Sequence, residues 1–201
     1  MSWNQTRCAR KKCRIRRQIR ALPRRSVVLA QDETDVLLFP PLRAGWSKRG
    51  EAAEVRLTGR NARRVVFGAM NLRSGMRLFV PRPKGRSGDF QAFLAELRSM
   101  YRGWHVALLL DEDPCHTAQA SARAAEGMTL LWLPKRAPEL NPMDTLWGQG
   151  KDIISADKQY ATIEEQVHRF LIHLTSLPNH EALHTSGVLS KKFWLRHVLS
   201  N

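Results

Sequence analysis

Short apolar runs separated by turn residues fill the first half of the chain, and this pattern predicts buried strands. The first run is Ser26–Ala30, and the polar residues Gln31, Asp32 and Glu33 follow at its end. Further strands are expected in a run from Val36 that is broken by Pro40-Pro41 and Gly45, and in Val55–Leu57, Arg64–Met70 and Met76–Val80. With Asn71–Gly75 as a turn, this half of the chain is predicted to form a meander.

Helical spacing and fully apolar runs alternate in the second half. A helix with one apolar face is predicted by the spacing of Phe90, Phe93, Leu94, Leu97 and Tyr101. Two apolar strands are then expected on either side of a helical stretch, over Val106–Leu110, Ala118–Glu126 and Thr129–Leu133. A strand, a helix and a strand in this order imply a parallel pair with a right-handed crossover.

The chain beyond Asn141 is predicted to be helical. One apolar face recurs at Ile163, Val167, Phe170, Leu171 and Leu174, and Leu189–Leu199 is expected to form a closing helix. Antiparallel strands, a parallel strand–helix–strand unit and terminal helices together predict an α/β fold, a mixed sheet flanked by helices.

The first 25 residues are unusually basic, with ten Lys or Arg and no acid. Ile15, Ile19 and Leu22 have rough helical spacing, which favours a basic helix packed on the body of the protein. A solvated or disordered charge run fits the same composition, so both interpretations stay open. The expected division is a basic arm over residues 1–25 and a single domain over residues 26–201.

The formal net charge of +15 points to a polyanionic partner, with nucleic acid ahead of a membrane surface or an acidic protein. No apolar run approaches the length of a membrane span, and the N-terminal region lacks the apolar core of a signal peptide, so a cytoplasmic protein without a membrane partner is expected. Cys8 and Cys13 resemble half of a zinc site, but no second ligand pair follows, which favours reduced, incidental thiols.

Three carboxylates lie at positions where a site could form. Asp32 and Asp111 each follow an apolar run, and Asp144 lies at a helix start. Strand ends of open sheets diverge and leave a crevice, and hard cations such as Mg²⁺ prefer carboxylate oxygens. Each acid has a structural alternative: Asp32 as a turn residue, Asp111 as part of a solvated loop, and Asp144 in a capping-box-like pair with Asn141, with Pro142 at the first helical position.

Four sequence blocks resemble mariner-type transposases, particularly their bacterial insertion-sequence branch. LPKRAPELNPMDTLW resembles the family's L-P-x-x-S-P-[ED]-L-N-P-I-E-x-x-W block, and LLLDEDPCHTA resembles its D-N-A-x-x-H block. VVLAQDETDVLLFPPLRAGWSKRGE and RRVVFGAMNLRSG are similar to its opening block and its next strand pair. The blocks occur in the family's order and cover the chain from Ser26 to Asp152.

This resemblance implies a ribonuclease-H-like fold, with a mixed five-stranded sheet flanked by helices. It also implies a site of the DDE type, here DDD, in which Asp32, Asp111 and Asp144 hold Mg²⁺ or Mn²⁺, two ions being expected, and cut and join DNA. His116 takes the family's His position, where it could support the site, approach DNA or be a structural His.

Three further residues of the family's loop are candidate DNA contacts or site supports: Trp46, Lys48 and Arg49. A core position is an equal alternative for Trp46, and Trp147 is expected to pack and hold its helix.

Several positions depart from the family's pattern. Asp144 stands where the insertion-sequence branch has Glu, Glu112 and Asp113 replace Asn and Ala, and no helix-turn-helix pair is predicted before the catalytic region. The expected function is a transposase catalytic domain that acts at transposon ends and on target DNA, with a homodimer in the synaptic complex. A truncated or decayed transposase is the alternative, and a non-catalytic basic nucleic-acid-binding protein is a third hypothesis.

Overall fold

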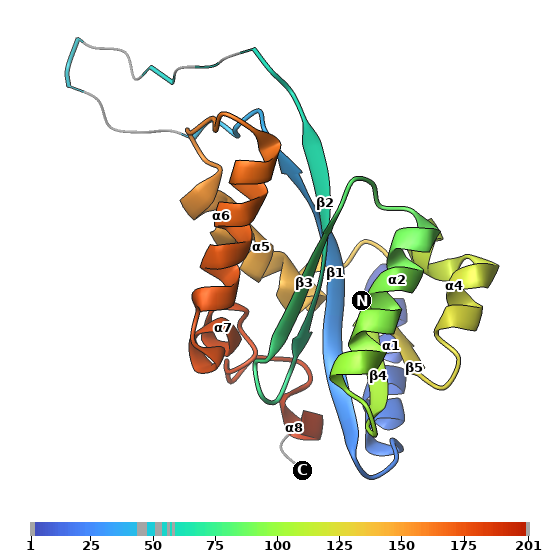
Figure 1. The fold of residues 1–201 in the computed structure, drawn as a ribbon. Coiled ribbons are helices and arrows are strands. Elements are labelled where there is room, and N and C mark those ends of the chain that lie inside the picture. Colours follow the sequence, from blue (N-terminus) through green and yellow to red (C-terminus); the bar gives the residue numbers. More distant parts are fainter. Residues whose placement is uncertain (1–2, 44–47, 51–53, 56, 58, 200–201) are drawn as a thin grey trace.

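The computed structural model describes residues 3–43, 48–50, 54–55, 57 and 59–199 of the 201-residue chain. In this part of the chain a five-stranded sheet in the order β3-β2-β1-β4-β5 lies between two layers of helices (Figure 1). Its strands are β1 (Ser26–Leu37), β2 (Arg63–Asn71), β3 (Arg77–Arg82), β4 (His105–Leu110) and β5 (Thr129–Trp132).

The sheet is mixed, as the sequence predicts. The strands β3, β2 and β1 pair antiparallel, whereas β1, β4 and β5 pair parallel. The crossover from β4 to β5 carries two short helices, α3 (Pro114–Thr117) and α4 (Gln119–Ala124). This arrangement of five strands matches the ribonuclease-H-like sheet implied by the resemblance.

The first strand is longer than predicted. The polar residues Gln31, Asp32 and Glu33 do not follow β1 but lie inside it, because β1 continues to Leu37. Its second half pairs with β2 from Gln31↔Ala69 to Leu37↔Arg63, so the ladder satisfies the backbone groups that a loop would expose to water. Asp32 nevertheless lies just beyond the parallel pairing with β4, whose last partners are Ala30↔Leu109.

Two other predicted elements are wrong. Val55 and Leu57 are not part of a strand, and residue 56 between them lies outside the described residues. The closing helix is only α8 (Arg196–Leu199), preceded by turns in which Ser190 and Phe193 donate short-range backbone hydrogen bonds.

Helices cover both faces of the sheet (Figure 1). One face carries α2 (Ser87–Met100) and α4, and the opposite face is covered by α1, the 3-10 turn η1 and α5 to α8. The bounds on the second face are α1 (Trp3–Arg20), η1 (Pro138–Leu140), α5 (Pro142–Ile154), α6 (Ile163–Ser176) and α7 (Asn179–Thr185).

The alternation of side chains in β1 assigns its two acids to opposite faces. Val28 and Ala30 pack in the core beneath α5 and α6, whereas Val27 and Leu29 pack in the core beneath α2. Because successive strand residues point to opposite faces, Asp32 shares the α5 side with Val28 and Ala30. Glu33 lies on the α2 side.

The basic N-terminal segment forms a packed helix. Ile15 and Ile19 of α1 are 2% and 6% exposed and belong to the core shared with β1 and α5. Lys11 donates hydrogen bonds to Glu112 at 2.5 Å and to the Leu133 carbonyl at 3.2 Å. Of the two interpretations of this segment, the packed helix is therefore the one observed. None of the described helices has the length and apolar character needed to cross a membrane.

Candidate metal-binding cleft

Three aspartates that lie far apart in the sequence line one cleft of about 460 Å³. Asp32 comes from the middle of β1, Asp111 directly follows β4, and Asp144 lies in the first turn of α5. The opposite wall is the segment between β5 and α5, with Leu133, Pro134, Lys135, Arg136, Ala137, Pro138 and Asn141 lining the cleft. The cleft therefore opens at the carboxyl end of β4, where sites form in open sheets.

Asn141 fixes the start of α5 to the central strand. Its side-chain Nδ2 donates to the Gln31 carbonyl at 2.9 Å, and its Oδ1 accepts from the Met143 amide at 3.2 Å. Asn141 thus caps α5, with Pro142 at the first helical position, as predicted. The capping oxygen accepts from Met143 and not from Asp144, so the capping-box-like pair is not formed. The exposed Asp144 carboxylate makes no hydrogen bond within the described part of the chain.

Asp32 is half-buried, and the indole of Trp147 holds one of its oxygens. Trp147 Nε1 donates to Asp32 Oδ2 at 3.1 Å while its ring packs against Phe79 and Phe170. Trp147 therefore packs, as predicted, and also orients a carboxylate. Gly68 pairs with Asp32 across the sheet, and a Cβ there would lie 2.5 Å from the Trp147 ring.

The charge around Asp32 is not balanced. Burial, followed by the negative charges of Glu33 and Asp111, raises the pKa of Asp32 to about 7. Asp144 adds a smaller effect in the same direction. Neighbouring carboxylates that oppose the ionisation of Asp32 suit a divalent cation, which prefers hard oxygen ligands and would offset the repulsion. The residues present thus fit Mg²⁺ or Mn²⁺.

Asp111 is held by groups on its own loop. Its Oδ1 accepts from the Asp113 amide at 3.1 Å and lies 3.0 Å from His116 Nδ1. The hydrogen bond from His116 is the main reason that the pKa of Asp111 lies below its usual range. Asp111 is therefore ionised at neutral pH and faces the cleft in a fixed orientation.

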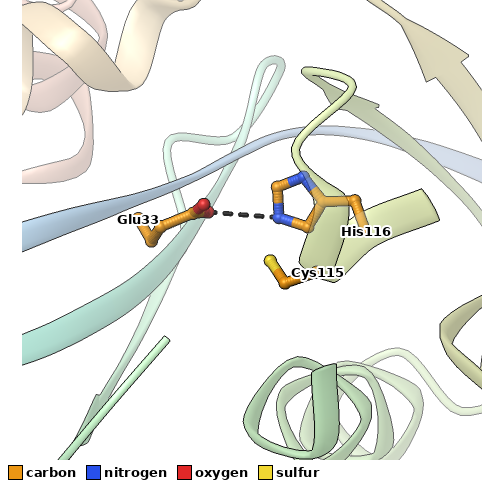
Figure 2. Close-up of side chains that lie close together, drawn as sticks. All are labelled: Glu33, Cys115 and His116. Atoms are coloured by element: carbon orange, nitrogen blue, oxygen red, sulfur yellow. Dashed lines mark ion pairs between the residues drawn. The ribbon is translucent and has the colours of Figure 1, made fainter. Parts of the chain in front are cut away.

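His116 lies behind Asp111, on the α2 side of the sheet. Its ring is 1% exposed, packs 4.5 Å from Phe90, and places Nε2 3.1 Å from Glu33 Oε2 (Figure 2). Burial alone would lower the pKa of His116, but the hydrogen bonds to Asp111, Cys115 and Glu33 outweigh it and raise the pKa to about 12. The imidazolium thus joins two carboxylates that β1 and β4 place on different faces.

The structure also brings Glu33, Cys115 and His116 together, with their potential ligand atoms within 4.8 Å of one another. This group is an ion pair rather than a metal site, because a protonated imidazole has no lone pair to offer and burial raises the pKa of the Cys115 thiol. The three aspartates line the cleft without forming so compact a group. Among the described residues, no such group includes Cys8 or Cys13.

Glu112 and Asp113, the two acids that depart from the family's pattern, have structural partners. Glu112 Oε1 lies 2.5 Å from Lys11 Nζ and its Oε2 lies 3.5 Å from Lys135 Nζ. The hydrogen bond from Lys11 is the main cause of the lowered pKa of Glu112. Asp113 caps α3 by accepting from the Cys115 amide at 2.8 Å. Glu112 is thus neutralised by two lysines, and Asp113 has a structural role at the start of α3.

The remaining predicted residues are Trp46, Lys48 and Arg49. Trp46 is outside the described residues. Lys48 and Arg49 are exposed in the connection between β1 and β2, and neither lines the cleft.

Several residues of the site were not predicted. Glu33 could have been found from its alternation with Asp32, and Lys135 and Arg136 from the basic pair in the PKRAPELNP loop. Lys151 lies two turns after Asp144 in α5; burial lowers its pKa, although Asp35, Asp144 and Asp32 act in the opposite direction. It therefore lies within electrostatic reach of two of the three aspartates.

Comparison with solved structures supports the fold. The chain superimposes on the Mos1 transposase paired-end complex with the left transposon end with a TM-score of 0.69 and 15% identity, covering 98% of this chain and 63% of that one. The crystal structure of the catalytic domain of Mos1 mariner transposase gives a TM-score of 0.66 at 12% identity, covering 100% and 94%. The ribonuclease-H-like sheet flanked by helices is thus the fold of this chain.

Two curated relatives match by sequence. An uncharacterised protein, y4pE/y4sA, of Sinorhizobium fredii is 35% identical over 83 residues, which cover 41% of this chain and 61% of that protein. The insertion element IS630 uncharacterised 39 kDa protein of Shigella sonnei is 24% identical over 158 residues, which cover 75% of this chain and 46% of that protein. The chain thus spans about half the length of these relatives. A family model described as DDE superfamily endonuclease matches residues 27–166, and the chain therefore belongs to that family.

Proposed function

We propose that this chain is the catalytic domain of an insertion-sequence transposase that cuts and joins DNA with Mg²⁺ or Mn²⁺. Its carboxylate ligands would be Asp32, Asp111 and Asp144, holding two ions. The observation that supports this most directly is that β1, β4 and α5 each supply one aspartate to the same cleft. A structural role could account for any one of these aspartates. It does not account for three aspartates from separate segments in the same cleft.

The chain's own residues would orient the ligands and receive the DNA. The metal ions, when bound, would activate the attacking oxygen and stabilise the leaving oxygen of a phosphodiester. Trp147 holds the Asp32 carboxylate, and His116 holds that of Asp111, so two ligands are oriented before any ion binds. Lys135 and Arg136 line the same cleft, where they would neutralise phosphate oxygens.

The proposed reaction has two steps. Water attacks the phosphorus at an element end, the bond from phosphorus to the 3′-oxygen breaks, and that oxygen takes up the proton. The freed 3′-hydroxyl then attacks a phosphodiester of target DNA and releases a new 3′-hydroxyl. Transposon ends, target DNA in the cytoplasm and a homodimeric synaptic complex belong to this proposal. The Mos1 transposase complex with a transposon end supports the part of this proposal that concerns transposon ends.

Nicking of supercoiled plasmid tests the proposal. Asp144→Asn is the sharpest variant because the exposed Asp144 carboxylate has no hydrogen bond in the described part of the chain that folding could lose. We expect Mn²⁺-dependent nicking by the wild type and none by Asp144→Asn, with equal DNA binding in EDTA. Asp152→Asn, which removes the same charge from the same helix at an ion pair with Arg43, should nick normally. Equal nicking by the wild type and Asp144→Asn would sink the proposal.

The net charge of +15 favours one further candidate, a nucleic-acid-binding protein without catalysis. It predicts strongly salt-dependent DNA binding and no response to divalent metal. A decayed transposase predicts metal binding at the three aspartates without nicking. A Mn²⁺ titration of the wild type and Asp144→Asn, run beside the nicking assay, separates these outcomes.

A further inference from the structure

We propose that a second site on this chain, an arginine pocket far from the aspartates, binds the phosphate backbone of DNA. The pocket has a volume of about 530 Å³ and lies where α1 leads into β1. Four arginines and one tryptophan give it its chemistry, namely Arg20, Arg24, Arg25, Arg73 and Trp104. The rest of its lining is apolar apart from Ser26.

The charge of the pocket is of one sign. No Asp or Glu is among its lining residues. Arg20, Arg24 and Arg25 are exposed and make no ion pair within the described part of the chain. Like charges gathered around a hollow repel one another, and a polyanion that enters the hollow removes that repulsion and releases counterions.

The backbone around the pocket is well defined. Arg25 adopts a left-handed conformation with φ of 62°, and its carbonyl accepts from the His105 amide at 3.0 Å. Ser26 Oγ donates to the Pro23 carbonyl at 2.5 Å. The turn that carries Arg24 and Arg25 is thus tied both to itself and to the start of β4. Arginines on such a turn extend their guanidinium groups from a backbone of fixed conformation.

Trp104 indicates nucleic acid rather than a simple anion. Its side chain is 48% exposed beside the arginines. An exposed indole in a cationic hollow can pack on a deoxyribose of the duplex backbone, which adds an apolar contact to the phosphate contacts. A free phosphate would use the arginines alone.

The pocket lies at the start of β1, and the cleft includes Asp32 from the middle of the same strand. Ser26 and Asp32 are six residues apart in one strand, a separation of about 20 Å. That span corresponds to about six base pairs at 3.4 Å each. The basic helix α1 runs between the two sites, with Lys11 at the cleft end and Arg20 at the pocket end. One duplex could therefore contact both sites, a consequence that rests on the proposed function.

The test compares two charge-matched variants in EDTA, with anisotropy of a labelled duplex several turns long. Arg24→Ala/Arg25→Ala removes two pocket charges, and Lys84→Ala/Arg123→Ala removes two exposed charges elsewhere. We expect the pocket pair to raise the Kd about tenfold and to reduce the slope of log K against log salt by about 1.8, and the control pair to change both far less. Arg24→Lys/Arg25→Lys should retain the wild-type slope.

Trp104→Ala gives an independent readout. It should weaken binding without changing the salt slope, while Phe39→Ala, at a phenylalanine 43% exposed, should leave binding unchanged. Equal effects of the pocket pair and its control would overturn the proposal and make the arginines ordinary solvated charges. The binding assay contains no divalent metal, so its result does not depend on catalysis. Absence of nicking in the plasmid assay would refute the proposed catalysis and leave the binding result unchanged.

Discussion

At the scale of single residues, Asp32 is placed where its ionised form is least stable. The folded pKa of about 7 lies above the ordinary value of 3.8, so folding favours the protonated carboxyl. The stabilisation from the protonated form is complete below pH 3.8 and is lost as the pH rises through about 7. Above pH 7, the metal-free protein therefore carries a destabilising buried charge. Sites that hold a reactive ion commonly sacrifice stability in this way.

Replacing Asp32 with Asn should relieve this cost. The amide oxygen can still accept from Trp147 Nε1, while the charge is gone. In EDTA above pH 7 we expect Asp32→Asn to raise the unfolding free energy by about 2 kcal/mol, less than the full pKa shift would give because water screens a partly exposed group. Denaturant unfolding across the pH range would measure it. A variant less stable than the wild type above pH 7 would show that Asp32 is not under electrostatic strain.

Gly68 illustrates how one missing methyl group gives the site its shape. The Trp147 ring occupies the space in which a Cβ of residue 68 would lie, 2.5 Å away. We expect Gly68→Ala to destabilise the fold by about 1–3 kcal/mol, since both the ring and the strand are buried. Gly148→Ala is the matched control in α5, where nothing lies within 4 Å, and it should stabilise the helix by about 1 kcal/mol. Thermal unfolding of both variants checks the contrast.

At the scale of elements, α1 belongs to the packed body of the protein. Ile15 is 2% exposed within the main core, whereas Ile172 on α6 is 51% exposed. Ile15→Ala should therefore cost about 3 kcal/mol through lost burial and a residual cavity, and Ile172→Ala should cost little. The measurement is the midpoint of urea unfolding. If Ile15→Ala lowered the unfolding free energy as little as Ile172→Ala does, α1 would contribute nothing to the stability of the sheet.

Elements with their own periodicity were predictable, and elements defined by pairing were not. The strand β4 is apolar from its second residue to its end and α2 has one apolar face, so each is evident locally. The second half of β1 contains Gln31, Asp32, Glu33 and Asp35, and it is a strand because β2 pairs with it. A strand partner that lies dozens of residues away does not change the local pattern of apolar and polar residues, so that pattern cannot reveal it.

The same distinction holds for the cleft. Asp32 and Asp111 each follow an apolar run and Asp144 opens a helix, so all three positions are visible in the sequence, and the resemblance implies their shared role. The contacts of Glu33 with His116 and of Lys11 with Glu112 join residues 83 and 101 positions apart. Such contacts follow from the packing of whole elements, which spacing alone does not determine.

At the scale of the whole molecule, a bound cation would connect three segments that belong to two layers, the sheet and the helices on one of its faces. It would join the sheet to the start of α5 through Asp32, Asp111 and Asp144. A cation that binds only the folded state stabilises the whole folded protein against unfolding. With Mn²⁺ at one hundred times its Kd, we expect about 2.7 kcal/mol of added stability. The gain should be larger above pH 7 than below it, because Asp32 must lose its proton to bind. Melting curves with Mn²⁺ or EDTA measure this, and Asp144→Asn should lose most of the gain.

The position of β1 in the sheet has a consequence during synthesis on the ribosome. β1 can pair with β2 as soon as that strand is made, but its parallel neighbour β4 follows only after β3 and α2. α5 follows later still, after β5. Pairings between distant segments form more slowly than local ones. A nascent chain therefore holds Asp32 without Asp144 while the residues between them are made, and the cleft with its three aspartates is completed only when α5 leaves the exit tunnel.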